Sequence, residues 1–334
     1  MYTNEDLNNA IKQGIFSKDS VSAFRNYQAK TKNSTIADEE NFRLISGFND
    51  IFVVIASGLL VFSLLYILKP INATLAYAVF TLSTWLLAEF FVRKRKMALP
   101  AVLLLLAFMG GSFALGMSLF SGFVNAQSFS IAALFTAGAG FLHWLRFKVP
   151  ITVAVGVLAL GVTFTIVLFK IFLPEADEST LRIAILVQGL AVFLLAMYWD
   201  SADKERITAK SDSAFWLHLL AAPLIIHPVF YSLGMLDRSG NLQSVLIVIA
   251  LYLFMTFISL VIDRRAFMVS SLIYVLYAFS NLIKEYGDID YGFAITGVFM
   301  GGLLVLLSAN WYQARKLALA LLPVSLKKYL PRSS

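Results

Sequence analysis

Long apolar stretches separated by short polar breaks run along most of this chain. The stretches are continuous and about 20 residues long, the length at which a helix spans about 30 Å of hydrocarbon. A β-barrel would show residue-by-residue alternation instead. The pattern predicts ten membrane helices, at about 48–68, 71–92, 98–120, 126–146, 150–172, 181–199, 214–235, 242–262, 266–283 and 289–310. The expected fold is an all-α polytopic membrane helix bundle over residues 48–310.

The first 47 residues are polar and differ from the rest of the chain. Leu7 and Ile11 lie one helical turn apart, Gly14 is suited to end that helix, and Ser17 is suited to cap a second one. Residues 1–47 are therefore expected to form a cytoplasmic helical hairpin and linker. Because so few apolar residues cannot build an independent core, the alternative is a docking module for a cytoplasmic protein partner.

Composition supports a membrane protein. Only 14% of the residues are charged, compared with about 25% in soluble domains, and mean hydropathy is +0.77. The net charge of +7 is explained by the excess of positive residues on the inner side of membrane proteins, and no nucleic-acid partner is expected. Without cysteine there is no disulfide framework or thiolate metal site, and neither a metal nor a cofactor is expected.

Basic residues predict the orientation. If both termini are cytoplasmic, only five of the 27 Lys and Arg residues fall in outside loops, as the positive-inside rule requires. Two clusters would then anchor helix ends on the inner side: Arg93, Lys94, Arg95 and Lys96, and Arg264 and Arg265. A site for anionic lipid headgroups is an alternative compatible with that role.

The C-terminal segment 311–334 is basic and amphipathic. Its leucines and flanking Lys and Arg residues predict a helix lying on the inner leaflet, in contact with the bilayer and anionic headgroups.

An internal repeat is suggested by two alignments. Residues 93–108 align without gaps to 264–279, and 61–65 are similar to 229–233. A parallel repeat would relate helices one to four with helices seven to ten, as in transporters whose site lies between the halves. The alternative is chance similarity between apolar sequences.

Carboxylates at membrane depth are costly, so each is a candidate functional residue. Glu89 could bind a proton or cation inside the bundle, or simply pair with Arg93 at i+4. Asp50 lies in the first turn of a helix, where the helix dipole favours a negative charge. Asp263, next to Arg264, is expected to be a solvated end pair.

Three histidines lie in or near predicted helices. His143 is expected at the interface. His218 and His227 share one helix but, nine residues apart, lie on opposite faces and do not form a metal motif. Together with Asp50 and Glu89, His143 and His218 could form a polar cytoplasmic vestibule if their side chains converge.

The helix that carries His227 also contains Pro223 and Pro228, which predict a break or kink. Next to such a break His227 could relay protons or contact a substrate; the alternative is a kinked packing helix. Ser112 falls at a depth similar to that of His227, and a serine–histidine pair would indicate an intramembrane hydrolase. Nearby glycines more simply indicate close helix packing.

Three segments carry a resemblance: GFNDIFVVIASGLL, AFWLHLLAAPLIIHP and IDRRAFMVSSLIY. With the N-terminal hairpin, they resemble a group of uncharacterised bacterial inner-membrane proteins that carry a domain-of-unknown-function label. The resemblance implies a multi-pass protein of the bacterial inner (cytoplasmic) membrane and no established activity. Ten helices with both ends inside is also similar to the drug/metabolite transporters, but their halves are inverted, against the parallel similarity above.

The leading expectation is a transporter-like bundle for a small solute or ion. A non-transporting scaffold or regulator that binds a partner through residues 1–47 is second, and an intramembrane hydrolase is third.

Overall fold

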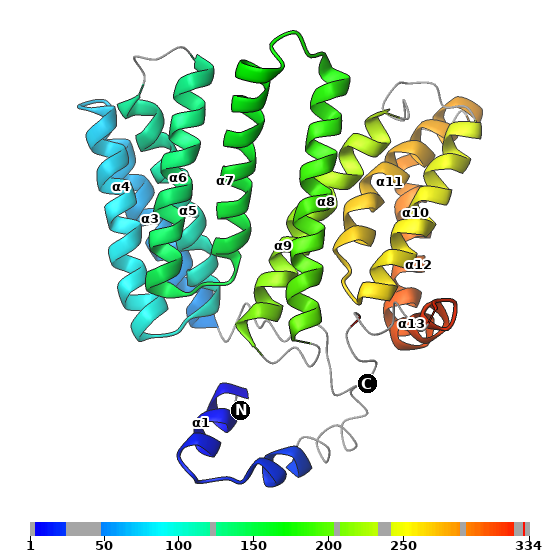
Figure 1. Cartoon of the computed structure of the whole chain (residues 1–334), viewed down its shortest axis with the longest axis horizontal. Helices are drawn as coiled ribbons and strands as arrows, with labels where there is room; N and C mark the ends of the chain where they lie inside the picture. Colours follow the sequence, from blue (N-terminus) through cyan, green and yellow to red (C-terminus); the bar gives the residue numbers. More distant parts are fainter. Residues whose placement is uncertain are drawn as a thin grey trace.

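The computed structural model describes residues 4–24, 48–120, 125–203, 208–232, 242–287, 292–323 and 330. Across those residues the chain is helical and contains no strand (Figure 1). The prediction of an all-α fold is confirmed. The predicted linker in residues 25–47 lies outside the described residues.

The helices of the bundle fall into two parts in chain order. The first part of the bundle holds α3 (Phe48–Leu68), α4 (Ala73–Ala88), the π-helix η1 (Glu89–Lys94), α5 (Ala98–Leu119), α6 (Asn125–Phe147), α7 (Ile151–Val167) and the π-helix η2 (Leu168–Phe172). The second holds α8 (Glu178–Ala202), α9 (Ala209–Ser232), α10 (Leu242–Ile262), α11 (Ala266–Gly287), α12 (Gly292–Ala309) and α13 (Trp311–Ala320).

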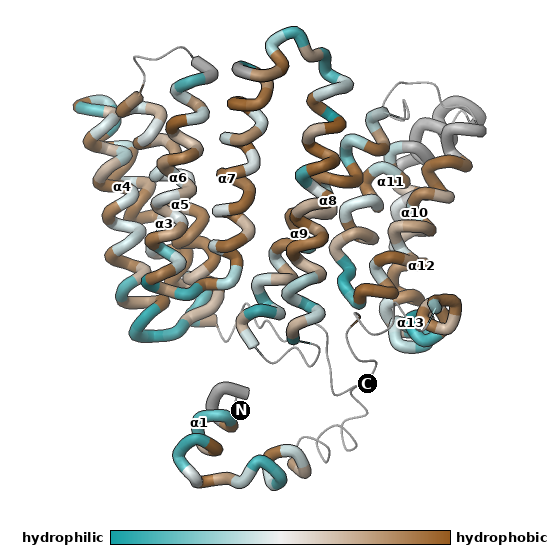
Figure 2. Tube along the Cα trace, in the orientation of Figure 1, coloured by the Kyte–Doolittle hydropathy of each residue, from teal (hydrophilic) through white to brown (hydrophobic). Residues whose placement is uncertain are grey.

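In the described part of the chain, seven helices from α3 to α9 are long and apolar enough to cross a membrane, with α4 extended by η1 and α7 extended by residues of η2. Helices α10, α11 and α12 occupy the last three predicted positions, and each carries a shorter apolar stretch within its described residues. Figure 2 shows the apolar residues along the helices and polar residues at connections such as that between α4 and α5. The protein is therefore a helical membrane protein, and the residues that the structure describes contain seven candidate spans.

The N-terminal segment contains two short helices, as the sequence predicted. Helix α1 (Asn4–Lys12) ends before Gly14, which adopts a φ of 71° that glycine tolerates without strain. The second helical stretch covers residues 18–24. The Ser20 amide donates to Ser17 Oγ at 3.0 Å, which makes Ser17 the expected cap.

Two apolar cores organise the bundle. The first is built on Leu105 and Phe108 of α5, with Val149 and Ile151 beside them. The second is centred on α9 and extends to α8 and α10–α13. Trp216 of α9 packs against both cores. Helix α7 also contributes to both cores, so it joins the two halves of the bundle.

Helices α8 and α9 extend beyond their predicted bounds. The Asp177 side chain accepts from the Thr180 amide, so α8 begins at Glu178 rather than 181. At its other end α8 continues past residue 199, because the carboxylate of Asp200 is buried among partners described below.

Helix α9 is also longer than predicted and is not broken at either proline: it stays helical through Pro223 and Pro228. A proline removes one backbone donor, and a helix can absorb that loss where neighbouring helices hold it in place. Helix α9 is buried over more of its length than the other candidate spans. The predicted break is therefore wrong, because the packing around α9 keeps the helix unbroken, and the alternative of a kink stays a prediction.

Three connections at the end of the bundle that carries α13 share one backbone feature (Figure 1). Lys96, Lys148 and Asp263 have φ values of 54°, 54° and 59°. Each residue follows a helix and precedes another within a few positions. A left-handed residue ends a helix sharply, so these connections are tight turns. We refer to this side of the bundle as the α13 end.

Candidate functional site

A stripe of small and apolar residues on α8 leads to a buried carboxylate. The buried positions of this helix are Gly189, Val192, Ala196 and Asp200, spaced three or four residues apart on one face. A Cβ at Gly189 would lie 2.9 Å from the backbone carbon of Leu224 in α9. The missing side chain therefore lets α8 and α9 approach closely, and Asp200 enters the contact between them at the α13 end.

Arg264 is the main partner of that carboxylate. Its Nη2 donates to Asp200 Oδ1 at 2.7 Å and its Nε donates to Oδ2 at 3.3 Å. The same Nη2 reaches the carbonyl oxygen of Ser211 at 3.2 Å and its hydroxyl at 3.1 Å. Arg264 comes from the turn between α10 and α11, so one guanidinium connects three parts of the second half.

His218 of α9 completes the group. Its Nε2 lies 3.0 Å from Asp200 Oδ2. Because an ionised carboxylate only accepts hydrogen bonds, Nε2 carries the proton and donates. The relative exposures of His218, Asp200 and Arg264 are 0%, 1% and 2%. We call Asp200, Ser211, His218 and Arg264 the Asp200 cluster.

The residue before Arg264 makes a second buried contact. Asp263 accepts from Trp311 Nε1 at 2.9 Å through Oδ1. Its Oδ2 lies 3.2 Å from Arg315 Nη1. Both partners belong to α13, and Asp263 is 3% exposed. The expected solvated pair at Asp263 is wrong, because α13 folds back over the α10–α11 turn and covers it.

The first half carries a different arrangement at the same end. Arg146 of α6 binds Glu89 at both oxygens, with Nε–Oε1 at 2.5 Å and Nη2–Oε2 at 3.1 Å. Arg93 adds the i+4 contact that the sequence indicated, at 3.3 Å. Glu89 begins the π-helix η1, and its side chain stays partly exposed at 26%.

The other predicted polar residues face different surroundings. His143 is fully buried, with its ring 4.5 Å from that of Phe147 and 5.8 Å from that of Trp85. It is thus a core residue of the first half rather than an interfacial one. Asp50 is buried in the first turn of α3. Glu89, His143 and His218 each contact a different set of side chains, so these contacts do not build one shared vestibule.

Ser112 and His227 also have separate partners. Ser112 Oγ donates to the Phe108 carbonyl of its own helix at 2.8 Å. His227 Nδ1 lies 2.6 Å from Tyr274 Oη of α11, and its side chain is exposed. The serine–histidine pair that a hydrolase would need is not formed in this structure.

Of the predicted anchor residues, Lys94 and Arg95 lie over the Phe90 ring at 6.0 and 5.6 Å, and both are exposed. Arg265 stacks on Trp311 at 5.0 Å. Arg264 does not fit a contact with lipid headgroups, because its guanidinium is turned inward and bound to Asp200.

A polar contact joins the two halves between α7 and α8. Gln188 Nε2 of α8 donates to Thr165 Oγ1 of α7 at 2.5 Å. Gly161 makes room for it, because a Cβ there would lie 2.7 Å from Gln188 Oε1. Gln188 is ten residues from the start of α8, about 15 Å along a helix and thus about half of the hydrocarbon thickness.

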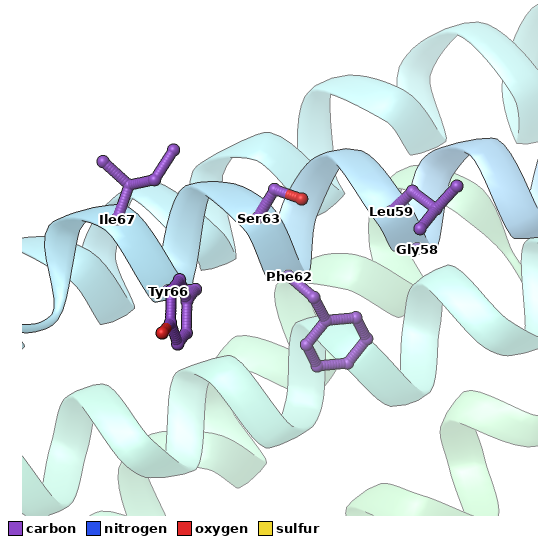
Figure 3. A pocket seen from close by; sticks show the side chains of 6 residues that line it. All are labelled: Gly58, Leu59, Phe62, Ser63, Tyr66 and Ile67. Atoms are coloured by element: carbon purple, nitrogen blue, oxygen red, sulfur yellow. The ribbon is translucent and has the colours of Figure 1, made fainter.

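Two open grooves in the first half of the bundle are apolar. One, of about 540 Å³, lies between α3, α4 and α5 and includes Val61, Phe80 and Gly110. A neighbouring one follows α3, where Figure 3 shows Phe62 and Tyr66 on the same side of the helix. Both lack charged side chains. They suit hydrocarbon rather than a polar ligand.

In the described part of the chain, no three His, Asp or Glu residues gather closely enough to hold a metal ion. No protein-family model, curated protein or solved structure matches this chain.

Sequence reasoning missed Asp200, Ser211, Thr165 and Gln188, as well as Arg146 as a partner of Glu89 and the α13 partners of Asp263. For Asp200 a signal was available: the spacing of Gly189, Val192 and Ala196 points to the next buried position on the same face. For Arg146 and Arg315 there was none, since their partners lie 57 and 52 residues away in the chain.

Proposed function

We propose that the protein moves a small solute or ion across the membrane between its two helical halves. The observation that carries the proposal is the Asp200 cluster. Ionisable residues at membrane helices are costly to bury and are usually retained for function. Here a carboxylate, a guanidinium and an imidazole are buried together where α8, α9 and the α10–α11 turn meet. We assign this cluster the role of a closure at the α13 end of the path.

The contact between Gln188 and Thr165 supplies a second element. Transporter sites lie near the bilayer midplane, at the junction of two halves. The Gln188 amide is about 15 Å along α8 from its start, and it donates to the Thr165 hydroxyl near the end of α7. A solute or ion that leaves water needs polar partners in its place, and these two side chains could supply them.

The proposed architecture has ten spans, both termini in the cytoplasm and a location in the bacterial inner membrane. The positive-inside pattern supports the orientation, and the three apolar helices α10–α12 support the number of spans. The parallel repeat is part of the proposal. Lys96 and Asp263, the left-handed residues of two helix–turn–helix connections, lie 167 residues apart, four residues short of the 171-residue offset between 93–108 and 264–279.

The test uses the absence of cysteine from the chain. Single variants Thr165→Cys and Gln188→Cys are treated with a membrane-impermeant maleimide in intact cells and in inverted vesicles. Ser179→Cys, at an exposed position in the first turn of α8, is the reactive control. Labelling of the cysteine at position 165 or at position 188 is expected and would show an aqueous path. If Ser179→Cys reacts and neither Thr165→Cys nor Gln188→Cys reacts from either side, the transport proposal fails.

A second candidate function is that of a scaffold, and one observation favours it. The N-terminal hairpin exposes Ile15 at 64%, Phe16 at 48% and Phe24 at 43%. Apolar side chains grouped on a small segment indicate a protein contact. A scaffold predicts a partner that copurifies with the full chain and is lost from Phe16→Ser. A partner that stays bound to that variant would count against the hairpin as the docking site.

A further inference from the structure

Helix α13 has two faces with opposite surroundings. One face holds Trp311, Arg315 and Ala318, which are all buried against the bundle. The other holds Tyr312, Lys316, Leu317 and Leu321, which are all exposed. We call these four residues the outer face of α13. Leu317 and Leu321 are exposed at 71% and 79%, a large apolar surface for so short a helix.

The position of α13 identifies what covers this surface. The helix starts two residues after α12 ends, so it lies at the level where an apolar helix leaves the bundle (Figure 1). Amphipathic helices at that level lie in the bilayer surface, with leucines among acyl chains and lysines near anionic headgroups. Lys316 beside Leu317 provides that combination. The bilayer surface is the partner that fits this face.

The buried face of α13 is tied to the Asp200 cluster through two consecutive residues. Asp263 binds Trp311 and Arg315 of α13, while Arg264 binds Asp200 and Ser211. Two hydrogen bonds hold the α10–α11 turn that contains both residues. The Arg264 amide donates to the Ser259 carbonyl at 2.9 Å, and the Ser259 hydroxyl donates to the Arg264 carbonyl. A shift of Asp263 would therefore move the backbone that positions the Arg264 guanidinium.

We propose that the outer face of α13 binds the bilayer surface, and that this binding holds the Asp200 cluster together through Asp263 and Arg264. The inference rests on the proposed function only in so far as the cluster closes a transport path. Its tests measure contact with lipid and exposure of the cluster, not transport, so that the two proposals can fail separately.

The first test concerns the surface. Leu317→Cys in the full chain carries an environment-sensitive fluorophore and is reconstituted into vesicles whose acyl chains are brominated. A blue-shifted emission quenched by bromine is expected. Ser179→Cys, exposed in the first turn of α8, is the control and should stay unquenched. Water-like emission from position 317 would overturn the proposed contact with the bilayer.

The second test concerns the link. Ala214 is fully buried on α9 between Ser211 and His218, so Ala214→Cys should react slowly with a maleimide. Adding Arg315→Gln removes the ion pair to Asp263, and labelling should rise about tenfold because a buried carboxylate without its cation is costly. Arg146→Gln, which breaks the ion pair of the first half, should leave the rate unchanged.

Two further variants complete the second test. Trp311→Phe removes only the indole donor to Asp263 and serves if Arg315→Gln does not fold. The double variant Leu317→Ser and Leu321→Ser leaves the Asp263 contacts intact and removes the contact with acyl chains. It should raise the labelling rate of Ala214→Cys, but by a smaller factor than Arg315→Gln does. Unchanged labelling in a folded Arg315→Gln or Trp311→Phe protein would overturn the link. A rise in Arg146→Gln equal to that in Arg315→Gln would also overturn it.

Discussion

The two halves of the bundle hold a carboxylate and an arginine at the same end but in opposite environments. In the first half Glu89 binds Arg146 and Arg93 at the edge of the bundle, where the side chains are 26%, 42% and 52% exposed. In the second half Asp200 binds Arg264 and His218, and none of the three is more than 2% exposed. Burial, not the chemistry of the pair, separates them.

This difference decides what each pair can do. Exposed ion pairs are screened by water and salt and contribute little to stability. In a buried pair, removing one partner leaves a charge that neither water nor protein compensates. The first pair can be lost with little consequence, whereas the second must be kept whole or opened as a unit. A group that is either fully paired or fully opened, such as the Asp200 cluster, is suited to the proposed closure of the transport path.

The largest expected effect comes from Asp200→Asn. This change keeps the shape of the side chain but leaves the Arg264 guanidinium buried without its counter-charge. We expect the free energy of unfolding to fall by about 3–5 kcal/mol, measured by thermal unfolding of the purified protein in detergent. The double variant Asp200→Leu with Arg264→Met removes both charges and should be more stable than Asp200→Asn. If the double variant is less stable, the cost does not come from an unpaired charge.

A smaller effect is expected at the contact between α8 and α9. In Gly189→Ala the new methyl group would meet the Leu224 backbone and the Ile225 side chain at 2.9 Å. Overpacking of this kind costs about 1–3 kcal/mol. Gly156→Ala on α7, where no atom lies within 4 Å of the added Cβ, is the matched control and should gain slightly through helix propensity. Equal unfolding midpoints for the two variants would contradict the close approach of α8 and α9.

Glu89→Gln tests the exposed pair directly. The unfolding midpoint should shift much less than in Asp200→Asn, and the shift should vanish in high salt because the pair is solvated. Midpoints at low and high salt measure this. A shift as large as that of Asp200→Asn, or one insensitive to salt, would mean that Glu89 is not a surface pair.

The smallest effect concerns the start of α8. The Thr180 amide and the Ser179 and Thr180 hydroxyls donate to Asp177, and these hydrogen bonds lower the pKa of its carboxyl to about 2. A lowered pKa means that the stabilisation is present above the ordinary pKa of Asp, about 4, and is lost as the pH falls through about 2.

Asp177→Asn keeps a good helix cap and should show a smaller fall in unfolding midpoint between pH 6 and pH 2. An unchanged dependence on pH would rule out this contribution of Asp177.

The sequence predicted the positions of the apolar helices well, because a run of about 20 apolar residues has few other solutions. Helix ends were predicted less well where polar side chains decide them. Asp200 looked like the edge of a loop and is the buried end of α8. The prolines of α9 looked like a break, yet packing on several sides keeps the helix continuous. Patterns along the chain report burial by lipid, but not burial by other helices.

The candidate site was harder to predict for a related reason. His218 was singled out because of its depth, but its partner Asp200 was not, and the contact exists only after α8 and α9 pair. Arg264 and Arg265 are adjacent and were treated alike. A left-handed backbone at Asp263 sends Arg264 inward and leaves Arg265 beside Trp311. A difference of one residue in a tight turn is invisible in composition.

The short turn between Ile262 and Ala266 also indicates where foreign sequence can be inserted. One extra residue there would rotate Arg264 away from Asp200 or Asp263 away from α13, so an epitope tag or a fiducial domain should abolish folding. The connection at Pro174–Ala176 is exposed or half-exposed at the other end of the bundle, and only Asp177 at its edge is engaged in capping. For imaging or affinity capture of this small membrane protein, that connection is the place to attach a marker.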